Sequence, residues 1–438
     1  MLLSKRKRYL SGSDWVINTL DRMMKVSTCA GNMSQLVLLL DAPLTEETVR
    51  NELNRFVTQF PVLEGRVARD WLLAPYWKIP AATGHDVNLT VSHHAGMLSA
   101  ETLLPALVQG INKPFRAESE HLAFHYFAGS EKSALAMTFD HRLFDARGAE
   151  SFLHLFQQTL NSAAPSGDIA FTSSSALTQW KQKFLAGRNV NRRIIALTKS
   201  SPHALTPPEG REKGFNYRLL TFSREETAAI YDRAYREAGY LMESPFFLAA
   251  ITRTVHDLFT VRSGSGSSYL IPVTTDLRPG HDPLQEMFFN HVSYLFYQIP
   301  VEQGADMKGL VTTFKQQMYD QVKAGFPRDL AEASLLTRIA PLSVLGKLLH
   351  APLKGKMATF VFSHLGKSTY QSAGFMGGVV ENIFHMPRVP VPPGLGFFSN
   401  YFNGRLNLVI SYLDGLLSDE EVRLLEAGIR KSFGVNPA

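Results

Sequence analysis

Two strand-like segments that run into a polar loop and then a helix constrain this sequence most, and they occupy residues 121–160. Apolar side chains alternate at 124, 126 and 128, and again at 135, 137 and 139, as in strands with one buried face. The second strand leads directly into the loop 140–148, after which Phe152 and Phe156 recur at helical spacing. This order predicts a sheet with a helix packed on it and a loop at the end of a strand.

His141 is the most informative residue of that loop. A rigid strand would hold its imidazole while the loop opens to a cleft, and imidazole is the natural general base near neutral pH. Asp145 follows four residues later and could fold back beneath the ring. On spacing alone, the simpler interpretation is a core histidine that is hydrogen-bonded by Asp145 and has no chemical role.

The rest of the chain alternates between strand-like and helix-like segments, and several helices have recognisable N-caps. Thr45 precedes an apolar face at residues 49, 53, 56 and 60. Ser223 and Ser418 are each followed by glutamate three residues later, which is the capping-box pattern. Asn403 and Gly404 predict a hairpin turn. Together these signals predict an α/β fold with mixed sheets.

The sequence divides into two comparable halves. The strings LTEET (44–48) and FSREET (222–227) each stand between a strand-like run and a helix, which hints at a duplication. Residues 161–175 and 200–214 are rich in Ser, Gly, Pro and charged residues, as linkers are. We therefore expect an N-terminal subdomain at 1–165, a linker region at 166–214 and a C-terminal subdomain at 215–438.

Composition excludes several classes of protein. Hydrophobic residues make up 45% of the 438 residues and charged residues 19%, which suits a globular core and argues against disorder. No apolar run reaches the roughly 18 residues of a membrane span, and MLLSKRKRYL lacks the apolar stretch of a secretory signal. The single cysteine, Cys29, allows no intramolecular disulfide and no cysteine-based metal site. We expect a cytoplasmic protein without a metal site.

The net charge of +6 is modest, and its densest patch is SKRKR at 4–8. One interpretation is a solvated tail. The other is attraction to an anionic partner, which would be a phosphorylated cofactor, an acidic carrier protein or a membrane surface. A nucleic-acid-binding protein usually has a stronger clustered basic face. Nucleic acid is therefore not an expected partner, whereas peripheral contact with a membrane is compatible with the sequence.

The segment DHRLFDARG (140–148) resembles the HHxxxDG motif of the condensation-domain and chloramphenicol-acetyltransferase-like acyltransferase superfamily. That group includes nonribosomal condensation domains, wax-ester synthases, alcohol acetyltransferases and polyketide-associated acyltransferases. Further resemblances follow in the family's order, at residues 8–66 with FPVLEGRV (60–67), PVTTDLRP (272–279), NHVSYLFYQIP (290–300), FSHLG (362–366) and 404–425. The resemblance implies two similar subdomains of mixed sheets flanked by helices, with a tunnel between them.

The same resemblance implies roles for individual residues. His141 matches the family's second, catalytic histidine. Asp145 matches an aspartate that organises the loop, often through an arginine, and Arg278 is the candidate partner. A buried carboxylate needs such a partner, although an Arg278 that only ties a loop would look the same in the sequence.

Two positions depart from the family motif. The first histidine is replaced by Asp140, which would either act on His141 or face away from it. The glycine after the aspartate is Ala146, with Gly148 two places on, so we expect Gly148 to help make room for substrate. The aromatic DFGWG loop of true condensation domains is not recognisable, which argues against a peptide-forming condensation domain.

The chemistry that the resemblance implies needs no permanently bound cofactor. Neutral His141 would take a proton from an alcohol or amine as it attacks an acyl-CoA or phosphopantetheine-linked acyl group. Ser363 and His364, on the FSHLG segment, are the candidate oxyanion donors. Cys29 has no identifiable partner as a nucleophile, and His93, His94, His291 and His385 are expected to be structural.

Three hypotheses follow. The chain is an acyltransferase that uses acyl-CoA and a small acceptor, or a condensation or release enzyme served by an acidic acyl carrier protein, or a catalytically silent relative that binds a partner or an acyl chain. Intact His141 argues against the third. The sequence names neither the acyl chain nor the acceptor.

Overall fold

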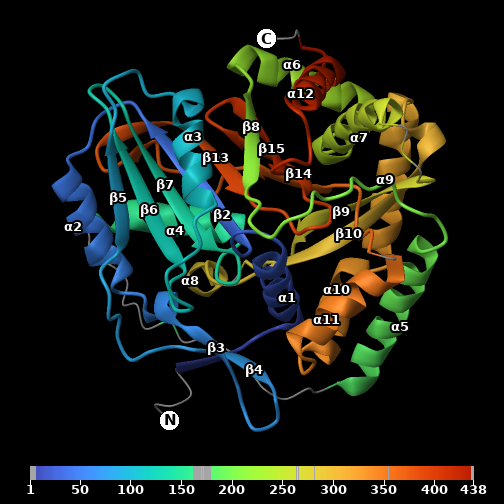
Figure 1. Ribbon diagram of the computed structural model, residues 1–438, viewed down its shortest axis with the longest axis horizontal. Coiled ribbons are helices and arrows are strands. Elements are labelled where there is room, and N and C mark those ends of the chain that lie inside the picture. Colours follow the sequence, from blue (N-terminus) through green and yellow to red (C-terminus); the bar gives the residue numbers. More distant parts are fainter. Residues whose placement is uncertain are drawn as a thin grey trace.

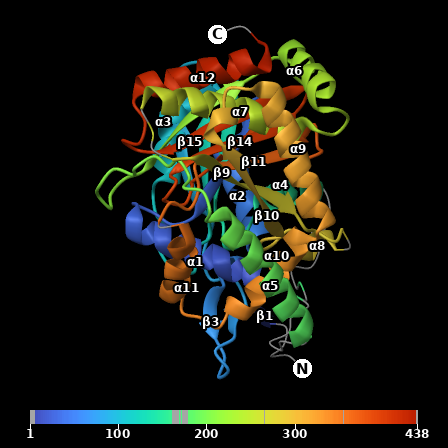
Figure 2. The same ribbon diagram turned by 90° about the vertical axis from the view of Figure 1, so that its right-hand side faces the viewer.

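The computed structural model describes residues 6–160, 169, 171, 179–262, 264, 266–280, 282–353 and 355–435. Its strands form two six-stranded sheets and one three-stranded sheet, and helices cover the two larger sheets (Figures 1 and 2). The expected α/β class with mixed sheets flanked by helices is confirmed.

The first large sheet contains the strand that carries the DHRLFDARG loop. Its strands, in spatial order, are β12 (Gly374–Phe375), β13 (Gly378–Pro387), β2 (Met33–Leu40), β7 (Ser133–Asp140), β6 (Leu122–Ala128) and β5 (Asn88–His93). Only β5 and β6 pair in parallel. Helices α2 (Glu46–Val57) and α4 (Ala146–Thr159) pack on one face and α3 (Ala100–Ile111) on the other. Since both faces are covered, residues 36–40 of β2 are a continuous apolar run rather than an alternating one.

Two strands of this sheet come from the second half of the chain. β12 and β13 lie within residues 215–438, yet β13 pairs with β2 in antiparallel register from Pro387 opposite Ser34 to Val380 opposite Leu40. Asp41 adds a bond at the end of the ladder, because its Oδ1 accepts from the backbone N–H of Val379 at 2.7 Å. The two halves therefore share one sheet.

The second large sheet is built from the second half alone. Its strands, in spatial order, are β10 (Val292–Pro300), β9 (Ser268–Asp276), β11 (Val361–Lys367), β14 (Leu395–Phe402), β15 (Arg405–Leu413) and β8 (Phe215–Thr221). β11 runs parallel to both of its neighbours, and the other pairs are antiparallel. The apolar faces of four helices pack in the same core, namely α6 (Arg224–Ala238), α7 (Glu243–Val261), α9 (Met307–Lys323) and α12 (Asp419–Phe433).

The smaller sheet lies at one end of the molecule, at the bottom of Figure 1. The sheet has the order β1 (Lys7–Tyr9), β4 (Pro75–Lys78), β3 (Arg66–Arg69). The remaining α-helices are α1 (Gly12–Ser27), α5 (Trp180–Leu197), α8 (Pro283–Glu286), α10 (Phe326–Ser334) and α11 (Leu342–His350). Short 3-10 turns cover Pro61–Glu64, Val301–Gln303, Leu335–Thr337 and Ala351–Leu353. Helix α5 falls within the predicted linker region, and α10 packs against it.

The local signals read from the sequence are present. Thr45 caps α2, and the capping boxes of Ser223 and Ser418 open α6 and α12. Asn403 and Gly404 both have positive φ, 47° and 79°, in the tight turn between β14 and β15. Among the described residues, no helix is both long and apolar enough to cross a bilayer.

Candidate active site

The loop after β7 places His141 directly after the last residue of a central strand of the first sheet. The backbone N–H of His141 donates to Asn32 O at 2.9 Å, which continues the sheet by one residue. Leu143 and Phe144 are fully buried and fix the loop from below. Asp145 then caps α4, and its Oδ1 accepts from Gly148 N at 2.9 Å. His141 is only partly buried, so its ring is held by a rigid element and is still accessible.

Asn290 holds the His141 ring with two hydrogen bonds. Its Nδ2 donates to the backbone carbonyl of His141 at 2.7 Å, and its Oδ1 lies 3.1 Å from His141 Nδ1. A carbonyl only accepts, so the first bond orients the amide and leaves its oxygen toward the ring. His141 Nδ1 must then be the donor. In the neutral ring the lone pair is therefore on Nε2, which is the arrangement that a general base requires.

Asn290 is itself fixed by contacts between the two halves of the chain. The preceding residue, Phe289, donates its backbone N–H to Leu143 O and forms a β-bridge with Phe144. Asn290 N also lies 3.4 Å from Oδ1 of Asp14, a buried carboxylate on α1 that pairs with Arg8. The partner of His141 is thus supplied by the C-terminal half and held by the N-terminal half.

Asp145 does not lie beneath His141, which corrects the simpler interpretation of the spacing. Its Oδ1 accepts from Gly148 N and from Nη2 of Arg278, and its Oδ2 accepts from His291 N at 3.1 Å. The expected pairing of Asp145 with Arg278 is present, and it joins α4 to the segment after β9. Burial alone would lower the pKa of Arg278, but Asp145 and Asp276 outweigh it and raise that pKa.

Asp140 faces away from His141, and a contact between Asp140 and substrate stays a prediction. Its buried carboxylate binds Arg142 Nη2 at 2.6 Å and His121 Nδ1 at 2.9 Å. Burial would raise the pKa of Asp140, but Arg142 and the hydrogen bond from His121 outweigh it and hold that pKa well below its usual range. His121 Nε2 lies 2.8 Å from Gly65 O. Since both ring nitrogens face acceptors, His121 is an imidazolium.

Comparison with known proteins was made by sequence and by structure. No protein-family model and no curated protein matches the chain. A solved structure of the TRI3 trichothecene 15-O-acetyltransferase from Fusarium sporotrichioides is similar, with a TM-score of 0.71 at 13% identity over 98% of this chain and 94% of that one. The first condensation domain of the CDA synthetase gives a TM-score of 0.68 at 13% identity, over 98% and 97% of the two chains.

A third similar structure is the epimerization domain from the third module of tyrocidine synthetase B, with a TM-score of 0.63 at 14% identity over 98% of this chain and 95% of that one. This chain has the condensation-domain and chloramphenicol-acetyltransferase-like fold. The fold that the motif resemblance implied is therefore confirmed, and the motif histidine lies at the end of a strand of that fold.

Gly148 lies where the C-terminal half packs against the start of α4. A Cβ at this position would lie 2.2 Å from the backbone carbonyl of Met287. The glycine therefore lets the C-terminal half approach α4 closely. The expectation that Gly148 also helps make room for substrate stays a prediction.

Ser363 and His364 lie on opposite faces of β11. Ser363 Oγ lies 2.7 Å from Thr274 Oγ1, on the face that also carries Asp276, whose carboxylate binds Arg278. His364 instead bonds Ser399 and packs its ring against Phe247 of α7, in the helix layer. Burial lowers the pKa of His364 to about 4, with a smaller contribution from Arg147, so this ring is neutral at pH 7. Ser363 therefore shares a face of the sheet with Asp276, the partner of Arg278, whereas His364 lies on the other face.

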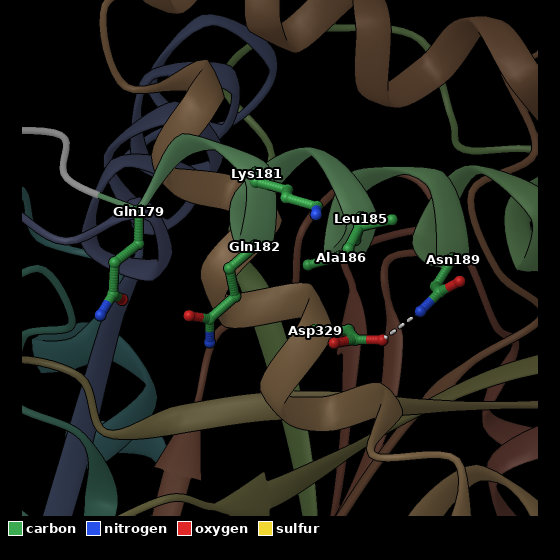
Figure 3. Close-up of a pocket in the computed structure, with 7 residues that line it drawn as sticks. All are labelled: Gln179, Lys181, Gln182, Leu185, Ala186, Asn189 and Asp329. Atoms are coloured by element: carbon green, nitrogen blue, oxygen red, sulfur yellow. Dashed lines mark hydrogen bonds between the residues drawn. The ribbon is translucent and has the colours of Figure 1, made fainter.

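Two surface cavities lie away from His141. The first, of about 420 Å³, is bounded by α5 and by Asp329 of α10, and Figure 3 shows Asn189 donating to that carboxylate at 2.9 Å. The second, of about 460 Å³, lies against α9 and Met242. Neither includes a residue of the DHRLFDARG loop, so the tunnel implied by the resemblance stays a prediction. No group of three or more His, Cys, Asp or Glu side chains among the described residues could hold a metal ion.

Sequence reasoning missed Asn290 as a site residue, although it opens the NHVSYLFYQIP segment. An asparagine between two phenylalanines and a strand was the only local signal. It also missed a buried pair in which His385 Nε2 lies 2.8 Å from Glu150 Oε1, with the same carboxylate accepting from Thr369 N at 2.6 Å. This pair ties β13 to α4, as expected for a structural histidine.

Proposed function

We propose that this protein is an acyltransferase that moves an acyl group from a pantetheine thioester, with acyl-CoA as the favoured donor, to a hydroxyl or amine. His141 is the general base. The observation that carries the proposal is the double hydrogen bond to Asn290, which leaves the lone pair of neutral His141 on Nε2. The acyltransferase-like fold supports the same class of reaction.

The proposed reaction has two steps at Nε2. The lone pair takes the proton from the acceptor O–H or N–H as that atom forms a bond to the thioester carbonyl carbon, and the carbonyl electrons move onto oxygen. The carbonyl then re-forms, the C–S bond breaks, and the departing thiolate takes the proton back from Nε2. Nδ1 keeps its proton on Asn290 throughout. General-base assistance of this kind contributes roughly 10²–10⁴-fold to the rate, and the positioning of both reactants contributes much of the rest.

The oxyanion needs a hydrogen-bond donor, and we propose Ser363. Because a hydroxyl has one proton, Ser363 can donate to the oxyanion only while Thr274 Oγ1 donates to Ser363 Oγ, 2.7 Å away. The paired side chains of Arg278 and Asp145 are proposed to have a positioning role only. Because both are occupied in joining α4 to the C-terminal half, they position the loop rather than touch substrate.

A carrier-protein-linked acyl donor is the second candidate. It is favoured by the similarity to the condensation domain of the CDA synthetase and by the net charge of +6, which suits an acidic carrier. The chemistry at His141 would be the same in both cases. The two candidates differ only in what delivers the thioester.

The deciding experiment is thiol release from a panel of acyl-CoAs of increasing chain length, with mixed alcohol and amine acceptors. We expect acceptor-dependent release that His141→Ala lowers by about 10²–10⁴-fold and that the matched surface variant His93→Ala leaves unchanged. Release from acyl-loaded carrier protein alone would select the second candidate. No release from either donor above the His141→Ala level would reject the proposal in favour of a silent relative.

A further inference from the structure

The turn between β3 and β4 presents three large apolar side chains to solvent. Trp71 is 87% exposed, and Leu72 and Leu73 are each 57% exposed. In both ribbon views this turn is the lowest point of the ribbon and projects beyond the body of the molecule (Figures 1 and 2). Contiguous apolar side chains on a protruding surface mark an interaction site more often than chance.

The apolar turn is rigid. Asp70 Oδ1 accepts from the backbone N–H of both Leu72 and Ala74 at 2.9 Å, and Leu73 N donates to Asp70 O at 3.0 Å. Leu73 adopts a φ of +64°, which such bonds help to hold. The side chains are therefore presented by a fixed turn, so little conformational entropy is lost when they are buried by a partner.

Arg69 connects this turn to a second exposed apolar strip. Its Nη1 donates to Ile339 O at 2.9 Å and its Nη2 to Ala340 O at 3.0 Å. Ile339 is exposed, and Val344 and Leu348 are exposed one turn apart on the adjoining helix α11. The apolar surface thus extends from the hairpin tip onto a neighbouring helix.

A row of cations lies behind the apolar tip. Lys78 of β4 stands directly opposite Lys7 of β1 on one side and Arg66 of β3 on the other, so the three side chains share one face of the sheet. Like charges in direct cross-strand register repel. Among the described residues, no carboxylate forms an ion pair with Lys78 or Arg66. An anionic surface facing Lys78 and Arg66 would therefore stabilise both cations.

Tyrosines separate the apolar tip from the cations. Tyr9 and Tyr76 lie opposite each other on the same face, two residues nearer the tip than Lys7 and Lys78, with ring centroids 5.7 Å apart. Arg66 is five positions from Trp71 and Lys78 is five positions from Leu73, so at a strand rise of about 3.3 Å per residue these cations stand roughly 15 Å behind the tip. This order matches the layers of a bilayer. The apolar tip would reach the acyl chains, the tyrosines would lie at the interface, and the cations would face the headgroups.

We propose that this end of the molecule, comprising the 71–73 tip and the Lys7–Lys78–Arg66 row, docks on the surface of an anionic membrane. The tip protrudes, so a folded protein partner would need a recess of matching shape. A bilayer needs no such recess, because its lipids can move apart around an inserted tip. Once the tip has entered the acyl region, the cations face the headgroups, and salt screens their attraction to anionic lipids. This docking is independent of the acyl-transfer proposal, because His141 takes no part in it.

The test is co-sedimentation of the full chain with vesicles of phosphatidylcholine alone and of phosphatidylcholine mixed with phosphatidylglycerol, at low and high salt. We expect binding to the anionic vesicles that salt weakens, and little binding to phosphatidylcholine alone. The triple variant Trp71→Ser, Leu72→Ser, Leu73→Ser should lose binding at every salt concentration. The double variant Arg66→Glu, Lys78→Glu should bind about tenfold or more weakly and lose the salt dependence.

A matched control removes exposed apolar residues at the opposite end of the molecule. Tyr240 and Leu241, in the turn between α6 and α7, are 75% and 68% exposed. The variant Tyr240→Ser, Leu241→Ser should bind vesicles as the parent does. Circular dichroism and thermal unfolding of each variant verify that the fold is retained, and thiol release from a soluble acyl-CoA shows that loss of docking is separate from loss of activity.

Tryptophan fluorescence provides a second measurement. Trp15 and Trp77 are buried and Trp180 is 49% exposed, so the part of a blue shift on addition of anionic vesicles that reports on Trp71 is the part that Trp71→Phe removes. Trp71→Phe should keep binding and lose most of the shift. The proposal is overturned if the parent binds neither vesicle type, if the variants bind as well as the parent, or if an acidic carrier protein binds this surface while vesicles do not.

Discussion

Two histidines lie on either side of Asp140 in the structure, and they are held in opposite ways. His121 is fully buried, with acceptors at both ring nitrogens, Asp140 and Gly65 O, so its charge is locked. His141 is partly exposed and has one nitrogen on the neutral amide of Asn290. A histidine bound at both nitrogens stabilises the fold, whereas one bound at a single nitrogen keeps a lone pair for chemistry. The burial and partners of the ring decide between these roles, not the proximity of an aspartate in sequence.

The largest effect should come from removing Asp140, the carboxylate that binds His121. We expect Asp140→Ala to lower the free energy of unfolding by about 3–5 kcal/mol, because it leaves the charges of His121 and Arg142 buried without their carboxylate. Urea unfolding measures this loss. Asp140→Asn, which keeps the shape, separates the loss of charge from the loss of packing. A change near zero in both variants would contradict the assignment of His121 as an imidazolium.

The pairing of Asp140 with His121 also predicts how the free energy of unfolding depends on pH. The pKa of Asp140 is lowered in the folded protein from an ordinary value of 3.8. A lowered carboxyl pKa contributes stability that is complete above the unfolded-state pKa and is lost as the pH falls through the folded-state pKa. The difference in unfolding free energy between the parent and Asp140→Asn should therefore be constant near pH 5 and shrink below about pH 4.

A smaller effect should come from removing Asn290, the residue that binds His141. Asn290→Ala should lower kcat by about 10–100-fold with little change in KM, because the ring loses the bond that selects its orientation and tautomer. Asn290→Asp keeps an acceptor for Nδ1 and should recover part of the rate. Its acid limb in the pH–rate profile should move to higher pH, because a carboxylate favours the imidazolium. An unchanged profile would indicate that Asn290 is only structural.

A still smaller effect is expected where the two halves meet. Gly148→Ala places a methyl group against the carbonyl of Met287, and we expect it to cost about 1–3 kcal/mol of stability. Thermal unfolding of Gly148→Ala beside Ala146→Gly distinguishes this collision from a general effect on α4. A Gly148→Ala variant as stable as the parent would contradict the close approach.

The smallest effect should be at His364. Its ring lies in the helix layer against Phe247, with Nδ1 on Ser399. His364→Asn should cost about 0.5–1.5 kcal/mol of stability at most and leave kcat/KM unchanged. A large loss of kcat/KM without unfolding would return His364 to the list of oxyanion donors.

Local signals predicted most of the fold, and long-range contacts account for what they missed. The caps at Thr45, Ser223 and Ser418 are contained in a few consecutive residues, so the helices they open could be identified from sequence. The pairing of β13 with β2 could not, because it joins segments that no local pattern relates.

The site divides in the same way. The position of His141 at a strand end followed from alternation and spacing, and the pairing of Asp145 with Arg278 followed from the family resemblance. The tautomer of His141 depends on Asn290, which is 149 positions away. The orientation of Asp140 depends on His121, which immediately precedes the neighbouring strand β6. Each of these contacts exists only after the sheets have formed.

The sharing of one sheet by both halves has a consequence for how the protein is made. Asp41 and Val379, which meet at the end of the β2–β13 ladder, are 338 positions apart. While the chain is being synthesised, β2 is exposed along the edge that β13 will cover, and it stays exposed until almost the whole chain has been made. Long-range pairing of this kind folds slowly and leaves an open strand edge in the meantime. We therefore expect chains cut short before residue 378 to aggregate rather than to accumulate as a folded first half.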